Sequence, residues 1–278
     1  MALEITFLGT GSAFTDYRLN YHNNAVVHTD AGPVLIDCGP TALQSLRELG
    51  IGLQQVRQIL VTHLHGDHIG GIEQLAWQRF YGDGDDDGPN WNRTPVCSTE
   101  RVLTDLRTSL WACMDEWTDR DGCSRDGYDH IVEPTIVAQD TAFEIGGVCF
   151  ELNWTPHVAV DDIIKPAFGV KVWRGEGDEV FYFTSDTTFR SDIGALYPRG
   201  AIFHDCNFAP AHGGSVHTHY SELLTLPDEV RARIVLMHHT VVPEGVDPLA
   251  DGFRAAAARH DRFDWTGTRV ESRMPNLS

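Results

Sequence analysis

The residues best suited to do chemistry are three histidines and an aspartate within six positions, His63, His65, Asp67 and His68. They follow an apolar run, 58–61, that predicts a short strand, so they lie at a strand end. In an extended turn His63 and His65 point to the same side, whereas the adjacent Asp67 and His68 reach a second position. Imidazole nitrogens and carboxylate oxygens are good ligands for Zn²⁺ and related divalent ions. The pattern therefore indicates metal binding rather than a chance histidine-rich surface loop.

Four ligands do not complete two metal sites, so further ligands are expected downstream. His157, Asp186 and His238 are each the first strong ligand after an apolar stretch that predicts a strand. Converging strand ends are where a shared site is normally built. Two alternatives remain open at this point. His239 competes with His238, and Asp186 has the ordinary use of capping the turn that follows it.

The elements that must position these residues are predicted from apolar runs and turn residues. Strands are expected at 3–8, 24–28, 34–36, 58–61, 143–145, 148–155, 168–173, 180–184, 201–205 and 234–237. Helices are expected at 41–49, 70–80, 99–117, 220–226 and 248–259. Two stretches of strands, each accompanied by helices, predict an α/β fold in which two mixed sheets pack together and helices cover the outside.

The segment 82–129 differs in character from the rest of the chain. It contains 12 acidic residues and 5 arginines, opens with the run GDGDDDGPN, and includes three tryptophans, Trp91, Trp111 and Trp117. The helix expected within it carries an apolar stripe that is typical of core packing. We therefore expect a single domain spanning 1–278, with an acidic helical insertion at about 82–129.

The charge balance limits the class of partner. The chain of 278 residues has 40 Asp plus Glu against 21 Lys plus Arg, a formal net charge of −19. Such a surface repels polyanions, so long nucleic acid and anionic membranes are disfavoured as partners. No apolar stretch reaches the roughly 18 residues of a membrane-spanning helix, and the opening residues lack the pattern of a signal peptide. Six scattered cysteines without a C-x-x-C pair indicate reduced thiols, so we expect a cytoplasmic protein.

The pattern H-x-H-x-D-H at 63–68 resembles the signature of the metallo-β-lactamase superfamily. The runs LGTGSA at 8–13, TSDT at 184–187 and FHDCNF at 203–208 narrow the resemblance to the ribonuclease Z-like branch. The resemblance extends over the chain except for 82–129. It implies an αββα metallo-β-lactamase-fold sandwich, two mixed sheets flanked by helices, with two metal ions at one edge of the sheets. It also implies a homodimer.

The resemblance further implies which residues bind each metal ion. The expected ligands are His63, His65 and His157 for one ion, Asp67, His68 and His238 for the other, and Asp186 as a bridge between them. Two divalent ions are therefore the expected cofactors. We expect Zn²⁺, with Mn²⁺ and Fe²⁺ as alternatives because they accept the same ligands.

A histidine just before a helix contacts the phosphate in this branch. With His217 in that role, the apolar residues of 220–224 fall at +3, +6 and +7, on one helical face. His219 remains the alternative. Counted from His219, the same apolar residues fall at +1, +4 and +5. Asp205 or His204 is expected to hold a metal-bound imidazole in place, because such rings need a partner on their second nitrogen.

Hydrolysis is the expected reaction. Two divalent ions beside Asp67 and Asp186 carry a net charge of about +2, and a water bridging them loses a proton near neutral pH. The hydroxide attacks a phosphodiester in line while the ions polarise its non-bridging oxygens. Asp67 orients the nucleophile or accepts its proton. A protonated His217 stabilises the developing charge or protonates the leaving alkoxide.

The substrate class is inferred from the resemblance and the charge. The tRNA-processing members carry a basic arm for tRNA, whereas the segment 82–129 is acidic and aromatic. A small phosphodiester, namely a cyclic mononucleotide, is therefore expected, and the run from His217 is similar to that of anti-Pycsar-type cyclic-nucleotide phosphodiesterases. The alternatives are a ribonuclease Z-like 3′-tRNA endonuclease, a lactonase or thioesterase, and a non-catalytic protein that sequesters a nucleotide.

Overall fold

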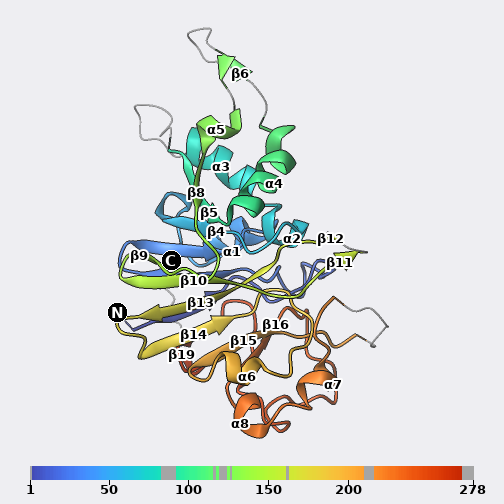
Figure 1. Cartoon of the computed structure of the whole chain (residues 1–278). Helices are drawn as coiled ribbons and strands as arrows, with labels where there is room; N and C mark the ends of the chain where they lie inside the picture. Colours follow the sequence, from blue (N-terminus) through green and yellow to red (C-terminus); the bar gives the residue numbers. More distant parts are fainter. Residues whose placement is uncertain are drawn as a thin grey trace.

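Two β-sheets packed face to face form the centre of the molecule in a computed structural model (Figure 1). The structure describes residues 2–82, 92–114, 117–118, 124–125, 127–160, 163–209 and 216–270. The first sheet has eight strands, in the order β19 (Arg269–Val270), β18 (Arg262–Asp264), β1 (Glu4–Phe7), β2 (Ala25–Thr29), β3 (Gly32–Ile36), β4 (Gln58–Leu60), β5 (Thr94–Ser98) and β8 (Val132–Ile136). The second has seven, in the order β17 (Ala255–Ala256), β16 (Ile234–Met237), β15 (Ala201–Asp205), β14 (Glu179–Phe183), β13 (Phe168–Arg174), β10 (Val148–Trp154) and β9 (Phe143–Ile145).

Helices cover the outer face of each sheet, so the layers run helix, sheet, sheet, helix (Figure 1). Beside the first sheet lie α1 (Ala42–Glu48), α2 (Gly66–Ile69), α3 (Ile72–Tyr81), α4 (Glu100–Trp111) and α5 (Gly127–Ile131). Beside the second lie α6 (Ile193–Leu196), α7 (Tyr220–Leu223) and α8 (Asp228–Arg231). A 3-10 turn, η1 (Leu53–Gln55), precedes β4, and two short ribbons pair β6 (Trp117–Thr118) with β7 (Ser124–Arg125) and β11 (Ala159–Val160) with β12 (Ile163–Ile164). The predicted α/β fold of two mixed sheets flanked by helices is confirmed.

The space between the sheets is filled by apolar side chains, with an aromatic group at the centre. The ring of Phe7 in β1 lies 5.5 Å from that of Phe203 in β15 and 6.3 Å from that of Phe183 in β14, centroid to centroid. It also lies 6.0 Å from the ring of Phe263 in β18. All four rings are fully buried. Because β1 and β18 belong to the first sheet and β14 and β15 to the second, this group joins the two layers.

Each sheet has a parallel portion whose strands end at the same edge. In the first sheet β3, β4 and β5 run parallel, and in the second β14, β15 and β16 do. Strand β10 runs in the same direction as β14, because both are antiparallel to β13. Loops that leave the carboxyl ends of such strands gather at one edge of a sheet. The sandwich therefore has a natural meeting place for the loops after β4, β10, β14 and β16.

One predicted helix is wrong. The segment 248–259 instead passes through Gly252, whose φ of +88° is left-handed, and then forms β17. A helix cannot continue through a left-handed residue, and Ala255 and Ala256 instead pair with β16 in parallel.

A second predicted helix is shorter than expected. The helix expected at 99–117 ends at Trp111, where the chain leaves through a tightened turn. In that turn the Cys113 N–H donates to the Leu110 carbonyl at 3.1 Å. The apolar stripe was correctly assigned to the core, because Val102, Leu103, Leu106 and Leu110 of α4 are buried.

The segment 82–129 contributes to the sheet as well as to its cover. Strand β5 lies within this range and pairs in parallel with both β4 and β8. Strand β5 is therefore part of the scaffold, and the expected insertion remains a prediction only for the residues on either side of it. Trp91 lies outside the described residues.

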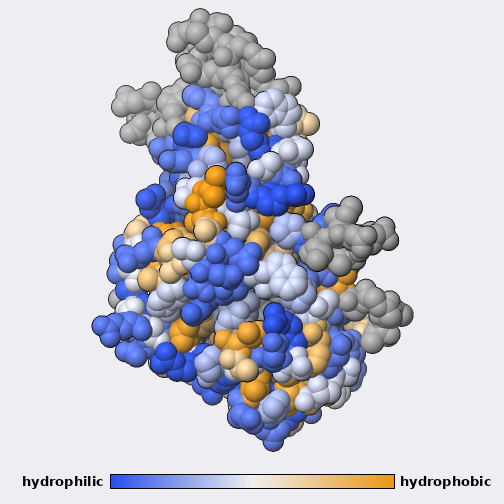
Figure 2. Space-filling model, in the orientation of Figure 1, coloured by the Kyte–Doolittle hydropathy of each residue, from blue (hydrophilic) through white to orange (hydrophobic). Residues whose placement is uncertain are grey.

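The molecular surface is mainly polar on the face shown in Figure 2, where apolar residues form separate patches. The longest described helix, α4, has 12 residues. None of the helices that the structure describes is both long enough and apolar enough to cross a membrane.

Replacing Phe7 by alanine should destabilise the fold by about 3–5 kcal/mol, because it leaves a cavity between the two sheets. Phe7→Leu should cost less, since it retains more of the buried volume. Urea unfolding followed by circular dichroism measures both changes. Leu249→Ala is the control, because Leu249 is 67% exposed and should change stability by less than about 0.5 kcal/mol. Equal effects of Phe7→Ala and Leu249→Ala would contradict the central role of Phe7.

Candidate metal centre

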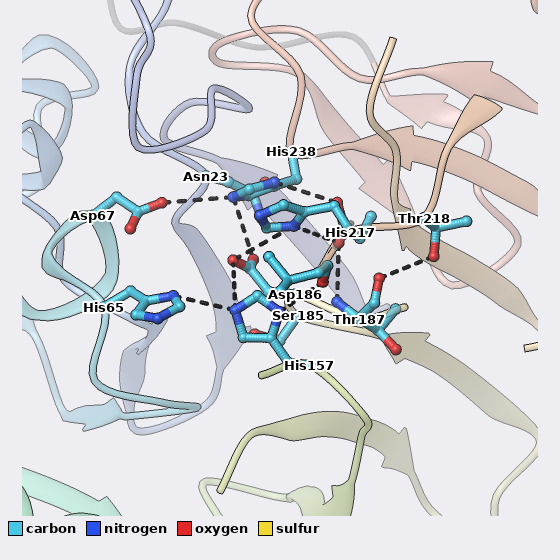
Figure 3. Close-up of polar contacts among 12 residues, drawn as sticks. Asn23, His65, Asp67, His157, Ser185, Asp186, Thr187, His217, Thr218 and His238 are labelled. Carbon is cyan, nitrogen blue, oxygen red and sulfur yellow. Dashed lines mark hydrogen bonds and ion pairs between the residues drawn. The ribbon is translucent and has the colours of Figure 1, made fainter. Parts of the chain in front are cut away.

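Loops at one edge of the sandwich bring together the residues that were expected to bind metal. Figure 3 labels His65, Asp67, His157, Asp186 and His238 among them. All the expected ligands lie directly after a strand or at the start of a helix: His63 and His65 after β4, Asp67 and His68 in α2, His157 after β10, Asp186 after β14, and His238 after β16. The first sheet therefore supplies four of these side chains and the second sheet supplies three.

In the first group, three imidazole nitrogens face one another. His65 Nδ1 lies 3.1 Å from His63 Nε2 and 3.1 Å from His157 Nε2. The carboxylate Oδ2 of Asp186 lies 3.6 Å from His63 Nε2 and 3.7 Å from His157 Nε2. Four donor atoms from both sheets thus lie close enough together to hold one cation.

In the second group, two imidazoles face two carboxylates. His68 Nε2 lies 3.3 Å from both Asp67 Oδ2 and Asp186 Oδ1. His238 Nε2 lies 3.5 Å from Asp67 Oδ2 and 3.3 Å from Asp186 Oδ1. Because Asp186 offers Oδ1 to this group and Oδ2 to the other, one buried carboxylate is shared by both.

The donor set fits divalent metal ions. A tetrahedral ion with ligands at about 2.0–2.1 Å holds neighbouring ligand atoms about 3.3–3.4 Å apart. Eight pairs of donor atoms here lie 3.1 to 3.7 Å apart, and all the donor atoms within each group lie within 4.8 Å of one another. Among the described residues, His68 Nε2, His238 Nε2 and Asp186 Oδ1 are buried without a hydrogen-bond partner. Buried polar atoms are almost always satisfied, and a cation bound here would satisfy all three.

Four of the imidazoles are held in place through their other ring nitrogen, Nδ1. In His63 it lies 3.0 Å from Thr62 Oγ1. The other contacts are His68 with Asp37 Oδ2 at 2.7 Å, His157 with the Val216 carbonyl at 2.8 Å, and His238 with Asp205 Oδ1 at 3.2 Å. A carbonyl only accepts, so Nδ1 of His157 carries the proton and its Nε2 keeps a lone pair. Contacts of this kind orient metal-binding histidines and fix their tautomer.

Asp37 belongs to this network and was missed in the sequence. Its Oδ1 accepts the Thr62 N–H at 2.8 Å and its Oδ2 accepts the Thr62 hydroxyl at 2.7 Å. Ser185 in turn donates its hydroxyl to Thr62 Oγ1 at 2.8 Å, so the loop before Asp186 is bonded to the loop before His63. The sequence did contain a feature that indicates Asp37, because it is the first polar residue after the apolar run 34–36, as the expected ligands are after theirs.

Left-handed backbone occurs at three non-glycine positions of the site. The φ angles are 62° at Asp37, 54° at Ser185 and 62° at His238. Such conformations cost about 1 kcal/mol or more each for residues with a Cβ and persist where the surroundings impose them. The loops are therefore bent so that the carboxylate and imidazole groups converge.

The ionisation of His63, His157 and Asp186 suits metal binding. Burial holds the pKa of His63 well below its ordinary value, and burial likewise lowers the pKa of His157. Burial alone would raise the pKa of Asp186, but the positive charges of His238 and His68 outweigh it and hold the pKa well below its ordinary value. Neutral imidazole and ionised carboxylate are the forms that bind metal. His68 and His238 differ, because burial is outweighed by the charge of Asp186 and the pKa of both rings is raised, so each must lose a proton when an ion binds.

The structure distinguishes the two candidates for the phosphate-contacting histidine. The His217 ring lies 4.7 Å from that of His238 and 5.1 Å from that of His157, and its Nδ1 lies 2.9 Å from Asp205 Oδ2. His219 instead caps α7, where its Nδ1 accepts the Ser221 N–H at 3.2 Å. His217 is therefore the one that faces the metal ligands.

The remaining alternatives are separated in the same way. His238 turns its Nε2 to Asp67 and Asp186, whereas His239 packs its ring against Phe208 at 5.5 Å. Of the two residues proposed to support a ligand, Asp205 contacts His238. His204 is fully buried, and its Nδ1 donates to the Asp205 carbonyl at 2.7 Å.

A cavity of about 970 Å³ opens beside the two ligand groups. Phe14, Tyr17 and Phe208 line it. The expected ligands Asp67, Asp186 and His238 also line it, as does His22, which the sequence did not predict. Trp111, one of the tryptophans of the segment 82–129, does not line this cavity and lies under the Arg107 guanidinium at 4.6 Å. The Phe and Tyr rings of the cavity wall thus come from the loop after β1 and the loop after β15, which the sequence alone did not suggest.

Comparison with known proteins assigns the chain to a family. The model of the family described as anti-Pycsar protein Apyc1 matches residues 3–263. The chain belongs to this family. The anti-Pycsar protein Apyc1 of Paenibacillus sp. (strain J14) is 32% identical over 249 residues, which cover 86% of this chain and 90% of that relative.

Solved structures identify the fold of this family member. The metallo-β-lactamase-fold protein YhfI from Bacillus subtilis superposes with a TM-score of 0.70 at 15% identity, covering 95% of this chain and 100% of that protein. Zn²⁺-bound PqqB from Methylobacterium extorquens superposes with a TM-score of 0.68 at 13% identity, covering 94% of this chain and 99% of that protein. The resemblance to anti-Pycsar proteins is confirmed, and so is the metallo-β-lactamase fold.

Asp205→Asn should weaken metal binding about 10- to 100-fold, because it removes the negative charge that orients the His238 imidazole. Competition for Zn²⁺ against a chromophoric chelator measures the dissociation constant. Asp228→Asn is the control, since its side chain is 93% exposed on α8. An unchanged dissociation constant for a folded Asp205→Asn protein would show that Asp205 does not support the site.

Proposed function

We propose that this protein is a dinuclear metal-dependent phosphodiesterase that hydrolyses a cyclic mononucleotide. The observation that carries the proposal is the sharing of Asp186 between two donor groups beside a cavity of about 970 Å³. One group contains three imidazoles and the other two imidazoles and a second carboxylate, so each offers four ligands to an ion. Membership of the anti-Pycsar family supports the choice of cyclic nucleotide as substrate.

In this proposal His63, His65 and His157 hold one divalent ion, Asp67, His68 and His238 hold the other, and Asp186 bridges them. The ions, when bound, supply Lewis acidity and lower the pKa of a coordinated water. Donor groups that lie 3.1 to 3.7 Å apart before binding need little rearrangement to take up an ion. We propose Zn²⁺ as the native metal, with Mn²⁺ as the alternative, since both accept imidazole and carboxylate.

Asp67 and His217 are the proposed catalytic residues. Asp67 lies on the cavity wall, and the adjacent imidazoles of His238 and His68 outweigh burial and lower the pKa of its carboxyl, which favours the charged form. It can therefore orient a nucleophile or accept its proton.

His217 is also on the wall of the cavity. Burial lowers its pKa, but the adjacent charge of Asp205 more than compensates, and the net pKa is raised. His217 is thus suited to share a proton with a phosphate oxygen or a leaving alkoxide.

Size and charge favour a small substrate over a long nucleic acid. The chain carries a net charge of −19, whereas the site would hold a local positive charge of about +2 once two ions are bound. A ligand with one phosphate reaches that centre, but a long polyanion must also approach the acidic surface. The cavity volume lies within the ~300–1,000 Å³ range of small-molecule sites.

Two further expectations belong to the proposal. The five cysteines described are all free thiols, which supports a reducing, cytoplasmic environment. The family resemblance supports a homodimer, which size-exclusion chromatography with light scattering would measure.

The decisive experiment presents the metal-loaded protein with cyclic mononucleotides, cyclic dinucleotides, a precursor tRNA, a lactone and a thioester. The expected product is a linear nucleoside monophosphate from a 3′,5′-cyclic nucleotide, with Zn²⁺ or Mn²⁺. His63→Ala should reduce turnover below detection, because it removes a ligand from the first group. Cleavage of the precursor tRNA without any cleavage of cyclic nucleotides would favour the endonuclease alternative and overturn the proposal.

Removal of metal should lower thermal stability as well as activity. Each ion present at about 100 times its dissociation constant stabilises the folded state by about 2.7 kcal/mol, and about 1 kcal/mol shifts Tm by roughly 2–4 °C in a protein of this size class. Differential scanning calorimetry with and without EDTA measures the shift. Asp186→Ala should lose the metal-dependent shift, because both donor groups use Asp186. A full shift retained by that variant would contradict the shared site.

A further inference from the structure

The loop between β1 and β2 folds back tightly beside the metal ligands. The chain turns at Gly9 and Gly11, where a Cβ would lie 2.3 Å from the Tyr21 carbonyl oxygen and 2.2 Å from Thr15 Oγ1, respectively. Only glycine permits such close approaches. The Gly11 N–H donates to the Tyr21 carbonyl at 2.7 Å, and the Asn23 N–H donates back to the Gly11 carbonyl at 2.8 Å. Residues 12–20 therefore form a loop whose two ends are held together by these backbone hydrogen bonds.

This loop is bonded to the segment that carries His238. Asn20 Nδ2 donates to the Thr240 carbonyl at 2.9 Å and to the Thr10 hydroxyl at 2.7 Å. The hydroxyls of Thr15 and Thr240 are also hydrogen-bonded to each other. The position of the loop is thus coupled to the loop after β16, and its side chains stand at a fixed place relative to the ligands.

Three ring-bearing side chains from this part of the chain line the cavity, Phe14, Tyr17 and His22, beside the small residues Ser12 and Ala13. Phe14 is 98% exposed and Tyr17 is 52% exposed, so both rings have a face available to a ligand. His22 is only 2% exposed, and the Tyr17 ring contacts its ring edge-on at 5.0 Å. The cavity therefore has aromatic rings at its mouth and a buried imidazole deeper in its wall.

Thr41 contacts His22 at its backbone N–H and at ring nitrogen Nδ1, so Nε2 lies on the opposite side of the ring. The Thr41 hydroxyl oxygen accepts the His22 backbone N–H at 2.9 Å and lies 3.3 Å from His22 Nδ1. With Thr41 donating to Nδ1, the proton of the neutral ring is on Nε2. That nitrogen is a hydrogen-bond donor on the side of the ring away from Thr41, in a wall that also contains Asp67 and His238.

From this arrangement we propose that the loop after β1 is the nucleotide-recognition element. Phe14 and Tyr17 stack on the base, and His22 donates a hydrogen bond from Nε2 to the sugar-phosphate ring. The assignment rests on the proposed function and extends it, because it names the residues that select a nucleotide over other phosphodiesters. Stacking on aromatic side chains tolerates any base, so the element would favour nucleotides as a class.

The test compares a 3′,5′-cyclic nucleotide with methyl riboside 3′,5′-cyclic phosphate, which has the same phosphate ring but no base. Wild-type protein should show a higher kcat/KM for the nucleotide. Phe14→Ala and Tyr17→Ala should each reduce that preference about tenfold, mainly through KM, within the roughly 5- to 150-fold range of a lost stacking contact. Tyr17→Phe should retain the preference, because it keeps the ring. Leu19→Ala is the matched control, since Leu19 is 59% exposed on the same loop and does not line the cavity.

His22 requires a different readout. His22→Ala should reduce kcat/KM for both compounds about equally, because its contact is with the shared ring, and His22→Gln should restore part of the loss through its amide donor. The metal content of both variants should match that of wild type. Calorimetric binding of a phosphorothioate cyclic nucleotide, which resists hydrolysis, should weaken in parallel with kcat/KM. Loss of metal from His22→Ala would overturn this role.

The outcomes separate the recognition element from the function on which it depends. If wild type cleaves neither compound and does not bind the phosphorothioate, the proposed function fails. If it cleaves both compounds equally well, the function stands and the stacking role of Phe14 and Tyr17 is wrong. If Phe14→Ala changes the oligomeric state and leaves the preference for the base intact, Phe14 belongs to an interface between copies of the chain and the proposal is overturned.

Discussion

The structure depends on the placement of one buried carboxylate, that of Asp186. A carboxylate that is only 1% exposed is strongly destabilised unless opposite charges surround it. Its two oxygens face different sets of imidazoles, with Oδ2 towards His63 and His157 and Oδ1 towards His68 and His238. Because these imidazoles come from both sheets, the charge is compensated only when the two halves of the sandwich are packed together. The complete set of contacts around Asp186 therefore requires both sheets.

Support for that arrangement comes from polar contacts that cross between the sheets. Ser185 bonds to Thr62, and Thr62 bonds to Asp37, so the loop of Asp186 is connected to the loop of the first histidines. Asp205 connects the ring of His238 to that of His217. Far from the loops, the aromatic group around Phe7 resists any sliding of one sheet over the other. The left-handed conformations in the loops are tolerated because this framework is rigid.

The acidic composition and a cationic centre are compatible because they act over different distances. A net charge of −19 is distributed over the whole surface and is screened beyond about 8–10 Å at physiological ionic strength. The donor groups of the site are buried, where charges interact more strongly. The charge of the chain therefore bears on the size of the substrate that can approach and not on whether the substrate is an anion.

The sequence by itself determined the fold class and the seven candidate ligands, because each ligand stands directly after an apolar strand or in the H-x-H-x-D-H run. It also contained enough information for Asp37, which follows the run 34–36 in the same way. The local pattern wrongly predicted a helix at 248–259, because Ala255 and Ala256 instead form a strand that pairs with the edge of β16.

Only the tertiary structure decided between neighbouring histidines and identified the walls of the cavity. His217 and His219 are two positions apart and chemically alike, and the capping of α7 by His219 leaves His217 to face the ligands. The contact of Asn20 with Thr240 joins residues 220 positions apart. Periodicity and spacing describe neighbours along the chain, and contacts across such separations arise only when the two sheets are packed.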